Sequence, residues 1–213
     1  MEFCMPIEEG DSEITLGVLN AVEQNSHITQ RDVAKNIGIA LGLTNTYVKR
    51  CIRKGLIKVQ QVPVNRYAYY LTPNGFAEKS RLTAEFLTQG FQFFRLARNQ
   101  CLEIFQNCEN SGWNNIALHG LTDLAEIAVL CAINFDLEIV GIIDNSTSLK
   151  RYAEKKVVAD ISELGDFDAI IITDLGDPQS SYEHMLQHFP ADRVFSPGIL
   201  NISSTDHVLR INK

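Results

Sequence analysis

Polar side chains suited to contacting nucleic acid lie close together between Gly42 and Lys54. If a helix begins near Leu43, its apolar residues fall on one side, where they can seat it on a core, and its polar residues on the other. Amide and hydroxyl groups can reach base edges in a major groove, and cationic groups pair with phosphates. A cationic helix face is often only solvated surface, so the neighbouring elements decide between the two interpretations. The candidate contacts are Thr44, Asn45, Thr46, Lys49, Arg50, Arg53 and Lys54.

The net charge of −7 is distributed unevenly along the 213 residues. Residues 1–110 hold 12 Lys and Arg against 11 Asp and Glu, a balance of +1, whereas residues 111–213 hold 7 against 15, a balance of −8. Within residues 31–66, eight cations stand against a single anion, Asp32. Because phosphate attraction is a local field effect, this distribution allows the N-terminal part of the chain to bind DNA on its own.

Two further helices are predicted before this stretch. Asp11 and Ser12 can cap a helix that runs to about Gln24, and Thr29 can cap a second helix that ends at Gly38. A short turn then leads into the cationic helix, which is the arrangement of a helix-turn-helix. The start of the second helix adds two candidate DNA contacts, Gln30 and Arg31.

A β-hairpin is predicted after the cationic helix, from strand-like runs at 56–61 and 66–71. This hairpin forms a wing whose tip can reach a minor groove or a phosphate through Asn65 and Arg66. The run KGLIK at 54–58, followed by YYLTPNGFAEK at 69–79, resembles winged helix-turn-helix regulators of the MarR type, in particular a subgroup associated with bacterial exopolysaccharide gene clusters. The resemblance covers about residues 12–95 and implies a DNA-binding transcriptional regulator with no enzyme activity in that part.

A long helix is predicted from Pro73 to about residue 109, with a break or bend at Gly90. Apolar residues recur along it at spacings of three, four and seven, and such a stripe is either a core face or the interface of a homodimer. The position of the helix between two domains favours the homodimer. Two cysteines of the stripe are either a redox pair across that dimer or, as we prefer, packing residues. The stripe consists of Leu87, Phe91, Phe94, Cys101, Phe105 and Cys108.

From about residue 110 the pattern changes to short apolar strands that alternate with helices. Apolar rather than alternating strands predict a parallel sheet covered on both faces, in a half-size Rossmann-like domain. Strands are predicted at 115–119, 138–143, 156–159, 169–173 and 193–196, and helices at 120–133 and 178–188. The predicted fold class is an α+β winged helix domain (1–72), a connecting and dimerising helix (73–109) and an α/β Rossmann-like parallel-sheet domain (110–213).

The turn after the first of these strands stands where dinucleotide-binding folds carry G-x-G-x-x-G. Thr122 and Ala125 replace the second and third glycines, and Asp144 follows 24 residues after Gly120, where a carboxylate can accept from ribose hydroxyls. NAD and a nucleotide-sugar are both compatible with this pattern, so the cofactor is left open, and the alternative is an ordinary polar turn. The predicted ligand contacts are Gly120, Leu121, Thr122, Asp123, Asp144 and Asn145.

These patterns together indicate a cytoplasmic bacterial regulator that binds double-stranded DNA as a homodimer, with an acidic domain that senses a small-molecule effector or stabilises the dimer. No apolar run is long enough to span a bilayer, so no membrane association is expected. The alternative is an NAD- or nucleotide-sugar-dependent enzyme whose winged helix mediates protein contacts. Tyr152 and Lys156 fit Y-x-x-x-K at an unusual position, and His184 and His188 lack a third metal ligand. We therefore predict no catalytic and no metal site.

Overall fold

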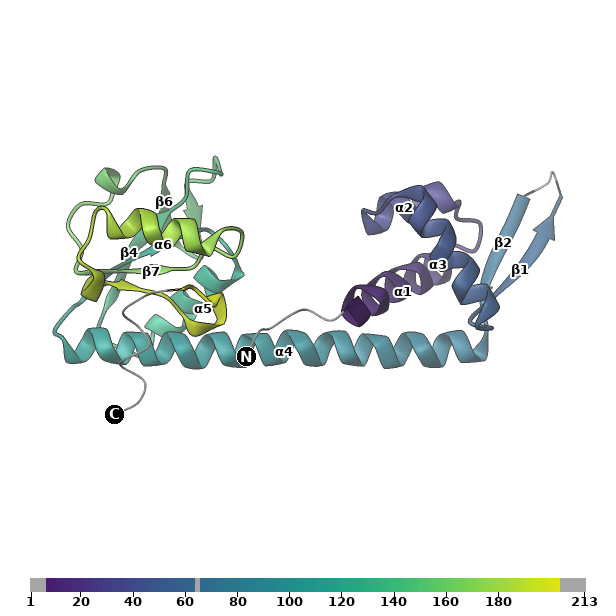
Figure 1. The fold of residues 1–213 in the computed structure, drawn as a ribbon, viewed down its shortest axis with the longest axis horizontal. Helices are drawn as coiled ribbons and strands as arrows, with labels where there is room; N and C mark the ends of the chain where they lie inside the picture. The colour runs from purple at the N-terminus through teal and green to yellow at the C-terminus, as the bar shows by residue number, and fades with distance from the viewer. Residues whose placement is uncertain (1–6, 64–65, 204–213) are drawn as a thin grey trace. The chain divides into compact units, whose positions relative to one another are not determined.

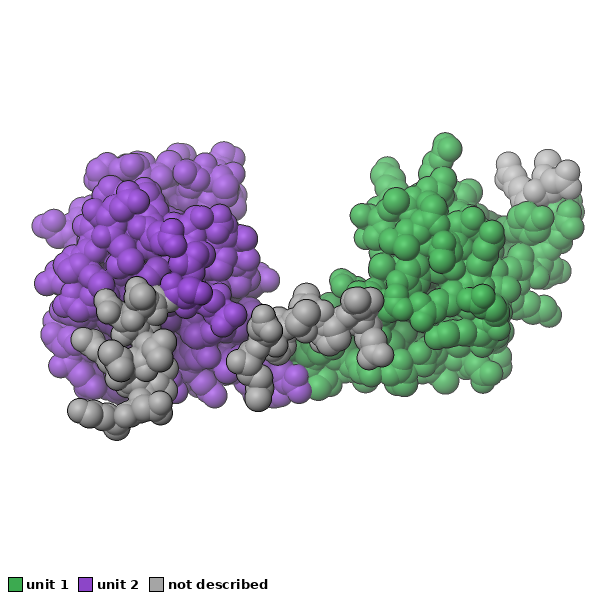
Figure 2. Space-filling view, in the orientation of Figure 1, with its two compact units in different colours: residues 1–91 green, residues 92–213 purple. Residues whose placement is uncertain are grey.

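The computed structural model describes residues 7–63 and 66–203. The chain divides into two compact units, Met1–Phe91 and Gln92–Lys213 (Figure 2). The boundary falls inside one helix, α4 (Pro73–Asn110), which contributes its first part to unit 1 and its second part to unit 2. The three-part division of the sequence at residues 72 and 109 stays a prediction. None of the helices in the described ranges has the length and apolarity needed to cross a membrane.

Unit 1 contains three helices and a hairpin before α4 (Figure 1). Apolar side chains from all of these elements, together with Leu82 of α4, close a single core. The two strands pair antiparallel in continuous register, as expected for a wing. The elements are α1 (Ile7–Gln24), α2 (Gln30–Ile37), α3 (Leu41–Arg53), β1 (Ile57–Val62) and β2 (Arg66–Leu71).

Short-range signals in the sequence explain where α2 begins and ends. The Thr29 hydroxyl accepts from the Asp32 backbone N–H at 3.2 Å and donates to the Asp32 carboxylate at 2.6 Å, which satisfies a free donor of the first turn. Gly38 ends the helix with a φ of 74°, a conformation that glycine adopts without strain. Both ends agree with the sequence prediction. The predicted cap of the first helix is wrong, because α1 already begins at Ile7 and Asp11 lies inside it.

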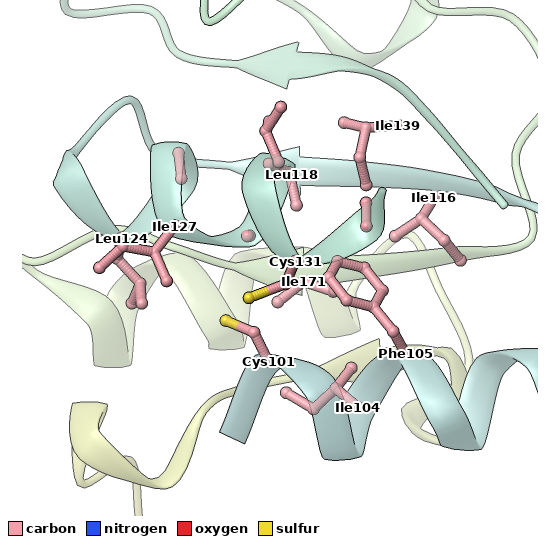
Figure 3. Packing of buried hydrophobic residues seen from close by; sticks show 14 of the residues in the cluster. Cys101, Ile104, Phe105, Ile116, Leu118, Leu124, Ile127, Cys131, Ile139 and Ile171 are labelled. Atoms are coloured by element: carbon pink, nitrogen blue, oxygen red, sulfur yellow. The ribbon is translucent and has the colours of Figure 1, made fainter. Parts of the chain in front are cut away.

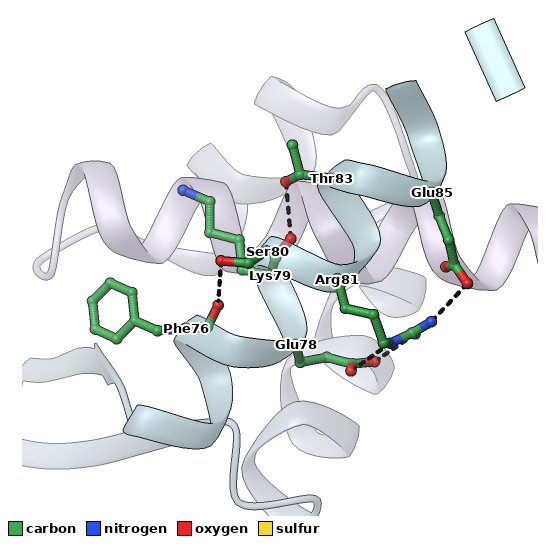
Figure 4. A network of polar contacts seen from close by, with 7 residues as sticks. All are labelled: Phe76, Glu78, Lys79, Ser80, Arg81, Thr83 and Glu85. Atoms are coloured by element: carbon green, nitrogen blue, oxygen red, sulfur yellow. Dashed lines mark hydrogen bonds and ion pairs between the residues drawn. The ribbon is translucent and has the colours of Figure 1, made fainter. Parts of the chain in front are cut away.

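Helix α4 is a single helix of 38 residues, so the predicted break at Gly90 is absent. The start of α4 packs closely against the backbone at Leu56, where a Cβ on Gly75 would lie only 2.1 Å from the Leu56 carbonyl oxygen. A few residues later Arg81 donates to Glu78 at 2.9 Å and to Glu85 at 2.7 Å (Figure 4). Ion pairs at these spacings join successive turns of a helix and so support its exposed surface.

Unit 2 contains a six-stranded sheet in the order β5-β6-β4-β3-β7-β8. All neighbouring strands run parallel except β5 and β6, which are antiparallel. The sequence prediction missed β5, because a strand of two residues is too short to show a pattern. The strands are β3 (Asn115–His119), β4 (Glu138–Ile143), β5 (Arg151–Tyr152), β6 (Lys155–Val158), β7 (Ala169–Ile172) and β8 (Val194–Phe195).

Helices cover both faces of this sheet. The second part of α4 packs with α5 (Asp123–Ala132) against one face, whose inward side chains include Leu118 and Ile171. The other face carries Ile170 and Ile172 and packs against α6 (Pro178–Leu186). Three short 3-10 helices complete the unit, at Ile161–Glu163, Ala191–Arg193 and Gly198–Leu200.

The predicted apolar stripe of α4 has two different environments. Cys101, Phe105 and Cys108 are fully buried within unit 2 and pack in the cluster that includes α5 (Figure 3). The prediction that the dimer seam includes these three residues is therefore wrong, because they belong to the core of a single chain. The remaining three side chains are exposed, with relative exposures of 51% for Leu87, 60% for Phe91 and 41% for Phe94.

Candidate nucleic-acid interface and effector cavity

The outward face of α3 carries the polar side chains best placed to meet a duplex. Thr46, Lys49 and Arg53 are exposed, and Asn45 is half-buried beside them. The opposite face, with Tyr47, Val48 and Cys51, is buried against α1 and α2. Within the described part of the chain, neither Lys49 nor Arg53 pairs with a carboxylate. Lys54, which follows the last turn, is exposed as well.

Thr44 is placed differently from the other predicted contacts on this helix. Its side chain is fully buried, and its hydroxyl donates to the Ala40 carbonyl oxygen at 3.1 Å. The hydroxyl thus satisfies a backbone acceptor at the start of α3 rather than facing solvent. We leave Thr44 out of the proposed interface.

Arg50 is tied to α1. Its guanidinium donates to the Asp11 carboxylate at 2.5 Å, and Tyr47 donates its hydroxyl to the same carboxylate. The hydrogen bonds from Tyr47 and then Arg50 hold the pKa of Asp11 below its ordinary value. The guanidinium carbon also lies 5.9 Å from the centre of the Tyr47 ring. Arg50 therefore joins α3 to α1. Its position in the sequence, among other cations, gave no indication of this role.

The remaining predicted contacts are only partly described. Arg31 is exposed at the start of α2, whereas Gln30 is half-buried and donates to the Tyr69 hydroxyl at 3.4 Å. Asn65 and the side chain of Arg66 lie outside the described residues. Sequence reasoning did not single out two exposed aromatic side chains of β2, Tyr67 and Tyr70. Because they are three residues apart, they lie on opposite faces of the strand, and its alternation could have indicated only one of them.

In unit 2, the turn after β3 makes a close backbone approach at Gly120. This glycine has a φ of 104°, and a Cβ there would lie 2.5 Å from the backbone nitrogen and Cα of Asp174. Any side chain at this position would displace the backbone at Asp174, two residues after the end of β7. The glycine is thus required by the chain's own backbone, before any ligand is considered.

The polar groups of the same turn already have partners within the chain. The Thr122 hydroxyl donates to the Thr173 carbonyl oxygen at 2.5 Å and accepts from the Leu124 N–H at 3.2 Å. Asp144 accepts from the Leu121 N–H at 2.7 Å, which is the donor that a phosphate at this turn would need. Burial raises the pKa of Asp144, but hydrogen bonds from Ser146 and Leu121 outweigh it and leave the pKa below its usual value. A charged carboxylate therefore already holds the Leu121 N–H, and this donor is not free for a phosphate.

A cavity of about 760 Å³ opens beside this turn, where β3, β4, β6 and β7 end. Such crevices at the carboxyl ends of parallel strands are the usual ligand sites of open α/β sheets. Gly120, Asp144 and Asn145 line it, whereas Leu121, Thr122 and Asp123 do not. None of its lining residues is Lys or Arg. Its ionisable side chains are Asp144, Asp160, Asp174, Asp177, His119, His184 and His188.

The three histidines lie near one another without forming a metal site. The ring of His184 is 6.4 Å from that of His119 and 5.0 Å from that of His188, measured between centroids. Burial lowers the pKa of His119, and the nearby Asp174 carboxylate offsets this only in part. Across the described residues, no group of three His, Cys, Asp or Glu side chains is arranged to hold a metal ion.

Comparison with known proteins identifies part of unit 1. Residues 11–58 match the family described as winged helix-turn-helix DNA-binding. This segment of the chain is a winged helix-turn-helix. No curated protein matches the chain.

Two solved structures of regulators are similar to part of this chain. The PcaV transcriptional regulator from Streptomyces coelicolor, in complex with its natural ligand, is 25% identical over 38% of this chain and 59% of its own, with a TM-score of 0.35. MepR, a transcription regulator of the Staphylococcus aureus multidrug efflux pump MepA, is 25% identical over 39% of this chain and 61% of its own, with a TM-score of 0.33. MepR in a DNA complex gives the same identity and TM-score. The chain thus spans about three fifths of each of these structures.

Proposed function

We propose that this protein is a DNA-binding transcriptional regulator whose helix α3 enters the major groove. The observation that carries the proposal is the outward face of α3, where Thr46, Lys49 and Arg53 are exposed and the two cations have no internal partner among the described residues. This face lies within the segment that matches a DNA-binding family. The polar side chains near the start of the helix would meet base edges, and the cations further along would meet phosphates.

Duplex binding at several salt concentrations tests this proposal. The double variant Lys49→Ala/Arg53→Ala should flatten the slope of log K against log salt by about 1.8, since each lost phosphate contact contributes about 0.9. The variant Lys150→Ala/Arg151→Ala removes the same charge from exposed positions of unit 2 and should leave the slope unchanged. Equal effects of the two variants, or no duplex binding by the wild-type protein at low salt, would refute the proposal.

The regulator is proposed to act as a homodimer through the exposed apolar residues of α4. Leu87, Phe91 and Phe94 follow one another at spacings of four and three, which places them on one side of the helix. Large apolar side chains with such exposure favour a protein partner over solvent. A second copy of the chain presents the same stripe, and an isologous contact around a twofold axis would cover both.

Unit 2 is proposed to be a Rossmann-like domain that binds a small-molecule effector in the cavity at the strand ends. A nucleotide or nucleotide-sugar was the expectation from sequence, but the Asp144 carboxylate on the Leu121 N–H repels a phosphate there. The cavity favours an effector without a pyrophosphate, because carboxylates line it and no Lys or Arg does. Control of polysaccharide genes rests on the sequence resemblance alone.

A thermal-shift screen of the full chain tests the effector proposal. The panel should pair NAD(H), UDP-sugars and GDP-sugars with the corresponding nucleosides, free sugars and amines. Ser180→Trp would fill the cavity from an exposed position on α6 without altering the core. A ligand of the cavity should stabilise the wild-type protein and not this variant. If no compound stabilises the wild type, or if both proteins respond alike, unit 2 has no effector in this cavity.

The alternative of a dehydrogenase-like enzyme finds no support in its motif. The Tyr152 hydroxyl donates to Glu126 at 3.1 Å, and the Lys156 ammonium donates to the Glu163 carbonyl oxygen at 2.7 Å. Each side chain thus serves a different local contact on the edge of the sheet. Neither of them lines the cavity at the strand ends.

A further inference from the structure

Two thiols from different helices of unit 2 meet in its core. Cys101 belongs to α4 and Cys131 to α5, and their sulfur atoms point toward each other (Figure 3). The Cys101 thiol donates a hydrogen bond to the Cys131 sulfur. The Cys131 thiol in turn lies 3.7 Å from the Arg98 carbonyl oxygen, to which it donates. This pair differs from the Cys101 and Cys108 spacing that the sequence brought to notice.

The environment makes the two thiols unequal. The hydrogen bond from Cys101 lowers the pKa of Cys131 below its ordinary value, burial opposes this, and the positive charge of Arg98 adds a smaller lowering. The same hydrogen bond raises the pKa of Cys101. Burial raises the pKa of Cys51 to about 11 and that of Cys108 to about 12. Because the thiolate is the reactive form, we assign the first attack on an oxidant to Cys131 and the second step to Cys101.

A small oxidant has a short path to Cys131. This residue is the last but one of α5 and is 3% exposed. Its neighbours Leu130 and Ile133 are exposed to 52% and 78%, so the final turn of the helix lies at the surface. Ends of helices open locally at a much lower free energy than the whole domain. We therefore expect fraying of this turn to admit a molecule the size of hydrogen peroxide.

We propose that Cys101 and Cys131 form an oxidisable dithiol, which peroxides convert to a disulfide that joins α4 to α5. The Cys131 thiolate attacks one peroxide oxygen, the O–O bond breaks, and the products are a sulfenic acid on Cys131 and, after protonation, water. The Cys101 sulfur then attacks the sulfenic sulfur, the S–O bond breaks, and the hydroxide leaves as a second water with the Cys101 proton. The two thiols lose two electrons in total, which the peroxide accepts.

Peptide mapping of the full-length protein after peroxide treatment tests the proposal directly. The native protein is exposed to hydrogen peroxide, free thiols are blocked with N-ethylmaleimide, and the digest is analysed by mass spectrometry with and without a reductant. We expect one cross-linked pair of peptides, containing Cys101 and Cys131, which dithiothreitol separates. A cross-link of Cys101 or Cys131 to Cys4, Cys51 or Cys108 instead, or Cys101 and Cys131 thiols that stay free until the protein is unfolded, would overturn the proposal.

Three serine variants assign the roles of the two thiols. Cys101→Ser should leave the sulfenic acid on Cys131 unresolved, so that dimedone labels Cys131 more strongly than in the wild type. Cys131→Ser should reduce dimedone labelling of the α4 and α5 peptides to background. Cys108→Ser is the matched control for Cys101→Ser, because Cys108 lies on α4 as well and is as buried as Cys101. This variant should keep the cross-link. Circular dichroism establishes that each variant is folded, and the wild-type mapping decides the proposal even if one variant is not. Dimedone labelling at Cys101 in place of Cys131 would contradict the assigned order.

Discussion

Two arginines of α3 that look alike in the sequence have different surroundings in the structure. Arg50 and Arg53 are three residues apart, but only Arg50 meets a carboxylate, that of Asp11 on α1. That carboxylate also holds the Tyr47 hydroxyl, so the three side chains fasten the start of the winged helix to α3. Arg53 has no such contact within the described residues and projects from the helix. We therefore expect affinity for DNA and stability of unit 1 to depend on different arginines.

Single alanine substitutions separate these two roles. Arg53→Ala should flatten the salt slope of duplex binding by about 0.9 and leave thermal unfolding unchanged. Arg50→Ala should lower the unfolding temperature and change the salt slope less than Arg53→Ala does. Fluorescence anisotropy and calorimetry on both variants provide the measurement, and the reverse assignment of effects would contradict this account.

We expect the half-buried imidazole of His119 to make the stability of unit 2 depend on pH. Its folded pKa is lowered from the ordinary value of 6.5, first by burial, so the unfolded chain takes up the proton more readily. The stability that this group contributes is present above about pH 6.5 and is lost as the pH falls below it. His119→Gln should flatten this part of the stability profile in urea unfolding. His27→Gln, at an exposed position in unit 1, is the control and should leave the profile as in the wild type.

At the scale of elements, α4 shows why one periodic pattern can have two meanings. Phe94 and Phe105 both belong to a stripe of spacing three, four and seven, yet Phe94 is 41% exposed and Phe105 is fully buried. The sequence records that both side chains are apolar and on one side of the helix. It does not record that α5 and the sheet of unit 2 cover only the second part of that side.

Two substitutions of phenylalanine along α4 distinguish a dimer interface from a core. Phe91→Asp places a carboxylate at an exposed position, so the fold should persist while a dimer that buries this position should dissociate. Phe105→Ala should leave the oligomeric state unchanged but destabilise unit 2 by about 3–5 kcal/mol, as expected for a large buried aromatic ring. Sedimentation analysis and chemical unfolding measure the two effects. A Phe91→Asp variant that sediments like the wild type would place the interface elsewhere.

The elements with strong local signals were predictable from sequence, and those fixed by distant neighbours were not. Thr29, Gly38 and the apolar strand β7 carry their signals in a few adjacent residues, and their elements lie as predicted. The role of Asp144 depends on the Leu121 N–H, which is 23 residues away in the chain and 2.7 Å away in space. The burial of Thr44 likewise depends on how α3 packs in unit 1. The polar outward face of α3 was thus predictable as a region, whereas the identity of its free side chains required the structure.

At the scale of the whole molecule, the net charge of −7 is the sum of two parts of the sequence that differ in charge. The cations concentrate around α3 and the wing, whereas residues 111–213 carry the excess of carboxylates, four of which line the strand-end cavity. Such a protein is repelled by DNA as a whole but attracted through one region, so its binding should depend strongly on salt and on orientation. Two copies related by a twofold axis would present two such regions to an inverted repeat.

The salt dependence of binding to a whole operator tests the dimer and the DNA interface together. A dimer on an inverted repeat, with half-site centres about 10 bp apart or a multiple of that, places two copies of Arg53 against phosphates. Arg53→Ala should then flatten the salt slope by about 1.8 on the full repeat and by about 0.9 on a duplex with a single half-site. The operator can be obtained by selecting bound genomic fragments, and the Phe91→Asp variant provides the monomeric reference. In the Phe91→Asp background, Arg53→Ala should flatten the salt slope by the smaller amount on both duplexes, because only one recognition helix engages each DNA molecule. If Arg53→Ala alone, without Phe91→Asp, changes the salt slope equally on both duplexes, the protein binds DNA as a single copy.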